Sequence, residues 1–223
     1  MLEYVAAKEE VGAAQVAIPY WMELTDRELL KFFSDLHIAS PGLPLVHYNN
    51  PRSKRFLGGE EYLRILQVAP NLIGVKFGMA GSNFGALQDA IWMTPQLSYF
   101  VGEDLLASGM QLGARGSYSS LIATNPAFMK EMYAAASSRQ WDKAFQMQIQ
   151  VAQFYARAVP FILDRGEGVI DPVFDKGLSV AAGCINGHQR CRAPYIGWSD
   201  ETVIAMRAWL KENYPMFVYP KTE

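Results

Sequence analysis

Two short apolar runs decide the fold of this chain: Pro44-Leu45-Val46-His47-Tyr48 and Leu72-Ile73-Gly74-Val75-Lys76. Between them, Tyr62, Leu63, Ile65 and Leu66 have the spacing of the apolar face of a helix. A strand, a helix and a second strand in so short a stretch are typical of a crossover unit with parallel strands. We therefore expect a strand-helix-strand unit over residues 44–76.

The same alternation extends in both directions along the chain. Before the unit, an apolar run at residues 14–18 predicts a strand, and Thr25-Asp26-Arg27-Glu28 has the pattern of a capping box that opens a helix. After it, a loop with Gly78, Gly81 and Ser82 is followed by predicted helices near 86–92 and 105–111 and predicted strands at 98–101 and 116–120. Alternation of this kind predicts an α/β fold whose parallel strands are joined by right-handed crossovers.

The second half of the chain has a different pattern. Asn125-Pro126 predicts a helix start, with Asn as the N-cap and Pro at the first helical position. Helical periodicity continues without an intervening strand through residues 127–136, 141–161, 174–182 and 201–214. We expect an α/β part over residues 1–125 and a helical part over 126–223, joined as one continuous body because no linker separates them.

The composition limits the class of protein. Half of the 223 residues are hydrophobic, which is enough to form a core. The net charge is −2, so the chain has no excess of basic residues for binding nucleic acid. No apolar run approaches the roughly 20 residues of a membrane span, and the first residues lack a signal-peptide pattern. Two cysteines do not make a disulfide framework. These features predict a cytoplasmic globular protein that binds neither membrane nor nucleic acid.

Lys76 is the most informative polar residue, because functional groups of parallel α/β sheets gather at the carboxyl ends of the strands. It ends an apolar strand, where desolvation would lower the pKa of its ammonium group and make the amine a nucleophile for a carbonyl substrate. The alternative is a strand-end lysine that reaches solvent. Tyr48, at the end of the preceding strand, either transfers protons or is a core residue whose hydroxyl bonds the backbone.

The strand-end motifs resemble those of the dihydrodipicolinate synthase and N-acetylneuraminate lyase family. The matching segments are Tyr48-Asn49-Asn50-Pro51, Gly74-Val75-Lys76, Gly102-Glu103-Asp104 and Gly113-Ala114-Arg115-Gly116, in the family's order. These enzymes are class I, Schiff-base aldolases on a (β/α)8 TIM barrel. The resemblance implies that the five strands are strands four to eight of that barrel. The chain is then a TIM barrel lacking its first three strands, with a C-terminal helical extension.

The same resemblance assigns roles to single residues. Lys76 takes the position of the Schiff-base lysine, and Tyr48 that of the tyrosine that handles protons and contacts the substrate carboxylate. The backbone near Gly78 and the side chain of Tyr118 are expected to shape the substrate pocket. The implied substrate is pyruvate or another 2-oxo acid, and the implied assembly is a homo-oligomer, either a dimer or a tetramer. No cofactor is needed for this chemistry.

The chain departs from the family pattern at three places. The Gly-Thr-Thr/Ser-Gly-Glu loop that binds the carboxylate has no match. Trp21 stands where dihydrodipicolinate synthases carry a second tyrosine, and Ser53 where they carry an arginine. Trp21, together with Cys191-Arg192-Ala193-Pro194-Tyr195, resembles the hydratase-aldolase branch instead. We expect Trp21 and Ser53 to contact substrate in this branch's manner.

Two hypotheses of function follow. In the first, the chain is a pyruvate-dependent lyase that acts through Lys76. In the second, it is an incomplete or catalytically impaired family member with a role in assembly or binding, because a five-stranded part of a barrel has two open edges. A metal site is not expected, since Cys184, His188 and Cys191 supply three ligands where structural zinc takes four.

Overall fold

The computed structural model describes residues 2–8, 10–78 and 83–220. Gly81 and Ser82 of the predicted loop lie outside these residues. The chain divides into two compact units, Met1–Tyr118 and Ser119–Glu223. The predicted boundary at residue 125 falls inside the second unit, and the single continuous body stays a prediction.

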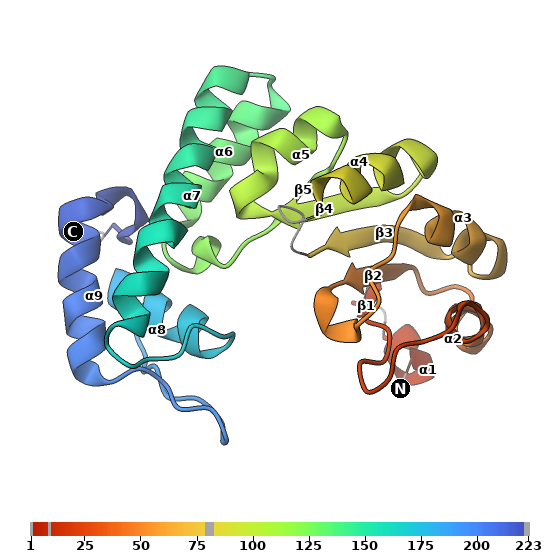
Figure 1. Cartoon of the computed structure of the whole chain (residues 1–223), viewed down its shortest axis with the longest axis horizontal. Helices are drawn as coiled ribbons and strands as arrows, with labels where there is room; N and C mark the ends of the chain where they lie inside the picture. Colours follow the sequence, from red (N-terminus) through yellow and green to blue (C-terminus); the bar gives the residue numbers. More distant parts are fainter. Residues whose placement is uncertain (1, 9, 79–82, 221–223) are drawn as a thin grey trace. The chain divides into compact units, whose positions relative to one another are not determined.

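The first unit is built on a five-stranded parallel sheet, which confirms the predicted α/β class (Figure 1). The strands lie side by side in chain order: β1 (Ala14–Val16), β2 (Leu45–Asn49), β3 (Leu72–Phe77), β4 (Ser98–Gly102) and β5 (Gly116–Tyr118). β1 and β5 end two residues earlier than predicted, at Val16 and Tyr118. At β1 the reason is Pro19, which has no N–H to continue a ladder, although Ile18 remains buried in the core.

Helices alternate with these strands along the first unit. They are α1 (Leu2–Ala6), α2 (Asp26–Ala39), α3 (Gly59–Val68), α4 (Phe84–Met93) and α5 (Leu106–Leu112), with 3-10 turns at Pro51–Ser53 and Glu103–Leu105. The predicted capping box at the start of α2 is confirmed. Thr25 accepts a hydrogen bond from the Glu28 backbone, and the Glu28 carboxylate accepts one from the Thr25 N–H. This reciprocal bonding fixes the point at which α2 begins.

The core of the first unit lies between one face of the sheet and these helices. Val75, Phe77, Tyr99 and Val101 are buried there with Tyr62 of α3 and Leu87 of α4. Successive side chains of a strand point to opposite faces of the sheet. Tyr48, Lys76 and Phe100 alternate with the buried residues and are only half-buried, so they lie on the other face.

The second unit is entirely helical in the part that the structure describes. Its helices are α6 (Pro126–Ser137), α7 (Trp141–Leu163), α8 (Val173–Ala182) and α9 (Asp200–Asn213), with 3-10 turns at Leu121–Ala123 and Pro215–Phe217. The predicted helix start is confirmed, because Asn125 accepts a hydrogen bond from Ala127 N–H and Pro126 is the first helical residue. Phe154 of α7 packs against Trp209, Tyr214 and Phe217 in the core. Among the described residues, no helix combines the length and apolarity needed to cross a membrane.

Candidate active site at the carboxyl ends of the strands

The register of the sheet brings the two principal candidates together. Tyr48 of β2 is paired with Lys76 of β3, and Lys76 is paired with Phe100 of β4. Because laterally paired residues of parallel strands point to the same face, the three side chains form one row across the sheet. The row lies on the face opposite the helices.

The amine of Lys76 lies over two tyrosine rings. Its Nζ is 3.9 Å from the ring centroid of Tyr48 and 4.7 Å from that of Tyr118 on β5. Phe100 contacts Tyr118 edge to face, with 5.7 Å between the ring centroids. In the described part of the chain Lys76 has neither a carboxylate nor a hydrogen-bond partner. An aromatic face attracts a cation, so the two rings can stabilise a positively charged group that forms at this position.

The position of Lys76 is set by its neighbours on β3. Val75 and Phe77 are fully buried in the core on the other face, and Phe77 contacts Phe56 and Tyr99 edge-on or tilted. A strand anchored at both flanking residues holds the intervening Cα in place. The flexible part of Lys76 is therefore confined to its side chain.

Tyr48 does not fit its alternative role, that of a core residue whose hydroxyl bonds the backbone. It is half-buried, and its hydroxyl has no hydrogen-bond partner among the described residues. A hydroxyl without a backbone acceptor remains available to a substrate or to water. The arrangement thus agrees with the proton-transfer interpretation, whose test is chemical.

Gly78 allows a close approach behind Tyr48. Its N–H donates to the Asn49 carbonyl oxygen at 2.8 Å. A Cβ at this position would lie 2.9 Å from that oxygen and 3.2 Å from Cε2 of Tyr48. Only glycine leaves room for both the backbone contact and the tyrosine ring.

The loop after β2 closes on itself. Asn49 is fully buried and bonds Leu57 twice, through its amide NH2 to the Leu57 carbonyl and through its side-chain oxygen to the Leu57 N–H. Ser53 is also buried, and its hydroxyl lies 2.8 Å from the Asn50 carbonyl oxygen and 2.7 Å from that of Arg55. In this conformation the hydroxyl donates to the loop itself. The predicted contact of Ser53 with substrate stays a prediction.

Trp21 follows β1 and is 85% exposed. Within the residues described, its ring packs against no other ring and no cation. Its carbonyl oxygen accepts a hydrogen bond from Lys54 Nζ at 3.0 Å, which ties the loop after β1 to the loop after β2. Trp21 is therefore not a packing residue of this unit, and its predicted contact with substrate is untested.

Phe100 was not singled out in the sequence as a site residue. It completes the row beside Lys76, and the signal for it was the alternation with the buried Tyr99. Asp104 follows β4 and is exposed as a residue, but desolvation of its carboxyl group raises its pKa. The strand-end Gly-Glu-Asp motif pointed to this segment, but its exposure could not be inferred from the sequence.

His47 lies behind the row, in the core. Its Nδ1 is 2.9 Å from the hydroxyl of Tyr62, and burial lowers the pKa of His47 to about 3. The ring is neutral at physiological pH and touches Phe33 edge to face. This histidine supports the strand that carries Tyr48 and has no access to the site face.

Potential metal ligands do not gather in the described part of the chain. No group of three His, Cys, Asp or Glu side chains is placed to hold an ion there, and Cys184 and Cys191 are both free thiols.

Comparison with known proteins shows which sequences this chain resembles. The model of the dihydrodipicolinate synthetase family matches residues 2–165. A 4-hydroxy-tetrahydrodipicolinate synthase from Dechloromonas aromatica is 30% identical over 149 residues, which are 66% of this chain and 50% of that enzyme. The chain thus spans about half the length of this curated relative.

Solved structures share the fold. A dihydrodipicolinate synthase from Aquifex aeolicus superposes with a TM-score of 0.77 at 21% identity, over 94% of this chain and 68% of the other. A prophage protein of the dihydrodipicolinic acid synthase family from E. coli K12, solved in complex with pyruvate, gives a TM-score of 0.74 at 18% identity, over 90% and 66% of the two chains. This likeness shows the fold, and the match of the family model over most of its length shows that the chain belongs to the dihydrodipicolinate synthetase family.

Proposed function

We propose that the chain is a class I lyase that forms a Schiff base between Lys76 and a 2-oxo acid such as pyruvate, and makes or breaks a carbon–carbon bond. The observation that carries the proposal is the position of Lys76 Nζ over the rings of Tyr48 and Tyr118, at the carboxyl ends of three parallel strands. Family membership supports the reaction class, and a family structure in complex with pyruvate supports the substrate class.

The reaction begins when the neutral amine of Lys76 attacks the ketone carbon. The carbonyl oxygen leaves as water, and the resulting imine takes a proton on nitrogen. In the cleavage direction, the electron pair of the breaking carbon–carbon bond moves into this iminium and leaves an enamine, while the other fragment departs as an aldehyde. Protonation of the enamine carbon and hydrolysis then release pyruvate and restore the amine.

Tyr48 is the proposed carrier of the proton in these steps. Its hydroxyl donates a proton to the carbinolamine oxygen that leaves as water, and the resulting phenolate takes the proton from the substrate alcohol as the carbon–carbon bond breaks. The restored hydroxyl then protonates the enamine carbon. The two aromatic faces stabilise the iminium, since its positive charge lies on the same nitrogen that they already surround. The iminium is the electron sink, so the reaction requires no metal and no organic cofactor.

The remaining candidate residues set substrate specificity in this proposal. Tyr118 and the backbone at Gly78 line the position of the 2-oxo acid. Trp21 and Ser53 contact the aldehyde portion, as the resemblance to the hydratase-aldolase branch suggests. An aromatic aldehyde would suit an indole ring that is free of contacts within its own unit.

Trapping the imine tests the proposal. The protein is incubated with pyruvate, reduced with borohydride and weighed intact, and the modified peptide is sequenced. We expect a pyruvate-sized adduct on Lys76 that is absent from Lys76→Arg, because a guanidinium does not form an imine. Lys54→Arg, in the neighbouring loop, is the matched control and retains the adduct. A reduced protein without an adduct, or with one on another lysine, would refute the proposal.

A second function is favoured by the sheet itself. Among the described strands, β1 and β5 each have one neighbour, and an edge strand is a template for another chain. We propose that the five strands correspond to strands four to eight of the family barrel and that the protein acts as a homo-oligomer. A non-catalytic assembly role becomes the better description if no imine forms while the oligomer does. Light scattering after size-exclusion chromatography measures the oligomer.

A further inference from the structure

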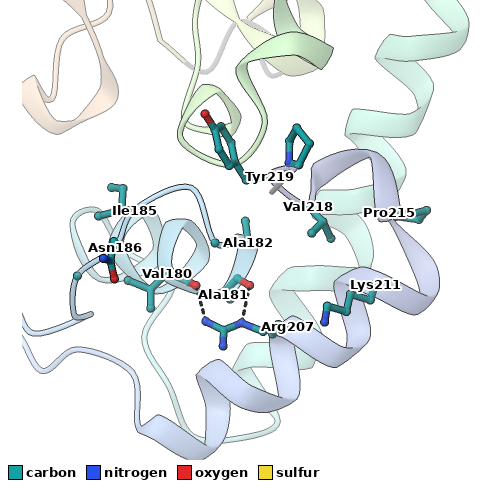
Figure 2. Close-up of a pocket in the computed structure, with 13 residues that line it drawn as sticks. Val180, Ala181, Ala182, Ile185, Asn186, Arg207, Lys211, Pro215, Val218 and Tyr219 are labelled. Carbon is teal, nitrogen blue, oxygen red and sulfur yellow. Dashed lines mark hydrogen bonds between the residues drawn. The ribbon is translucent and has the colours of Figure 1, made fainter. Parts of the chain in front are cut away.

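A pocket of about 920 Å³ lies within the second unit, far along the chain from Lys76 (Figure 2). It is bounded by the end of α8, by one face of α9 and by the segment from Pro215 to Pro220. This volume is within the range of small-molecule sites. The proposed lyase reaction makes no use of the pocket.

Arg207 forms one wall of the pocket by reaching from α9 to the last turn of α8 (Figure 2). Its Nη2 donates to the Val180 carbonyl oxygen at 2.9 Å and its Nε to that of Ala181 at 3.2 Å. These bonds use two of the five guanidinium N–H donors. The other three donors have no partner in the part of the chain that the structure describes.

Lys211 follows one helical turn later on α9, on the same face as Arg207. Its side chain is exposed, and no described residue bonds or pairs with it. No acidic side chain of the described residues lines the pocket. Two cations without a counter-charge therefore border one cavity, and they favour an anion.

Three carbonyl groups at the end of α8 already have donors, which reduces the repulsion that they exert on an anion. Those of Val180 and Ala181 accept from Arg207, and that of Ala182 accepts from the Tyr219 N–H at 3.0 Å. The rest of the lining is largely apolar, and Ile185 in particular is 50% exposed. A ligand that covers this isoleucine gains apolar burial as well as charge pairing.

We propose that this pocket binds a small organic anion, a carboxylate or phosphate attached to an apolar body. The anionic group pairs with Lys211 and the free donors of Arg207, and the apolar body lies against Ile185 and Val218. Charge complementarity and pocket size both support a small amphipathic ligand. The site is separate from the lyase residues and does not depend on their chemistry.

The test uses the full chain and three eight-carbon probes: octanoate, octyl phosphate and the neutral octan-1-ol. We expect saturable binding of at least one anionic probe by calorimetry, with amide chemical-shift changes near Ala182–Gly187 and Lys211–Tyr219. Binding of only octanoate or only octyl phosphate identifies the preferred head group, and either result supports the proposal. Octan-1-ol that binds as tightly as the anions would overturn it, as would the absence of saturable binding.

Variants test the charge pairing and the apolar contact separately. Lys211→Gln is expected to lower the affinity for the anionic probe about tenfold, because the complex loses one charge-assisted hydrogen bond. Lys130→Gln, an exposed lysine on α6 with the same loss of charge, is the matched control and leaves the affinity unchanged. Ile185→Asp removes apolar contact and adds a negative charge, so it should abolish binding. Equal affinity in Lys211→Gln and the unmodified protein contradicts the proposal.

Discussion

At the residue scale, the position of the Tyr48 ring depends on Gly78, because an added side chain at Gly78 would displace that ring. We predict that Gly78→Ala pushes the Tyr48 ring away from Lys76 and reduces the yield of borohydride-trapped pyruvate adduct several-fold. The Cβ would lie 2.9 Å from a backbone oxygen, so a loss of about 1–2 kcal/mol in the free energy of unfolding accompanies the change. Adduct yield by intact mass and urea unfolding are the two measurements.

Gly85→Ala is the control for this substitution. Gly85 lies in α4, and an added Cβ would meet nothing within 4 Å. Alanine in a helix is favoured over glycine by about 1 kcal/mol, so this variant should be slightly more stable and should trap pyruvate normally. If Gly78→Ala traps pyruvate as well as Gly85→Ala does, the ring of Tyr48 is not held in place by the glycine.

His47 makes stability depend on pH in a defined direction. Its pKa is about 3 in the folded protein against 6.5 for a free histidine, so below pH 6.5 the unfolded chain binds a proton that the folded chain does not. The contribution of His47 is complete above pH 6.5 and is lost as the pH falls toward 3. Between pH 6.5 and 5 we predict a decrease of about 2 kcal/mol in the free energy of unfolding from this residue.

The double variant His47→Leu with Tyr62→Phe isolates this effect, because it removes the titrating ring together with the hydroxyl that would lose its partner. Its unfolding free energy, measured with urea, should change little between pH 6.5 and 5. This window lies above the range in which most carboxylates titrate. An equal pH slope in the double variant and in the unmodified protein would assign the dependence to other groups.

At the scale of elements, the packing of α8 depends on a glycine beneath an indole ring. Trp198 is 2% exposed and donates a hydrogen bond from Nε1 to the Gly168 carbonyl oxygen at 2.8 Å. Its ring occupies the space that a Cβ on Gly177 would need. We predict that Gly177→Ala destabilises the second unit by about 3 kcal/mol, since the overpacking outweighs the helix-propensity gain.

The same measurement on Gly85→Ala again supplies the control, as a helical glycine with open space. Urea unfolding is followed by tryptophan fluorescence, to which the buried Trp198 contributes together with the other four tryptophans. Should Gly177→Ala unfold at an unchanged urea concentration, α8 must be able to move away from the indole at little cost.

The elements themselves could largely be predicted, because their signals are local. The capping box at Thr25 and the Asn125-Pro126 start fixed two helix boundaries. Apolar runs located the first four strands, and a weaker, more polar run located the fifth. The lateral pairing of Tyr48 with Lys76 is non-local. It depends on a register that shifts by one residue between Leu45 and Val46, which composition and periodicity do not encode. The resemblance to a family supplied this pairing.

Loop side chains were the least predictable part of the site. The hydroxyl of Ser53 lies within hydrogen-bond distance of two carbonyl groups of its own loop, and the sequence did not indicate these contacts. Trp21 is 85% exposed, and its ring packs against no other ring among the described residues. Such positions depend on which backbone groups a turn leaves unpaired, and adjacent sequence does not determine that.

At the scale of the whole molecule, the two edge strands of the sheet offer backbone groups through which copies of the chain can associate. Side-chain and backbone directions alternate along an edge strand, so only every second N–H points outward. Ala14 N–H bonds Pro44 and Arg115 N–H bonds Tyr99, which places the N–H groups of Gln15 and Gly116 on the open sides of β1 and β5. These two amides are therefore direct reporters of edge pairing.

Amide hydrogen exchange by NMR at several protein concentrations tests the proposed homo-oligomer. If copies associate through the sheet edges, protection of Gln15 or Gly116 rises with concentration, because association supplies an acceptor that dilution removes. Val16 and Ser117 point inward on the same strands and act as internal controls with concentration-independent protection. The amide of Val75 on the central strand β3 should be among the slowest to exchange, since its exchange requires the sheet to open. Exchange of Gln15 and Gly116 that stays fast at every concentration, in a protein that light scattering finds oligomeric, would assign the interface to the helices.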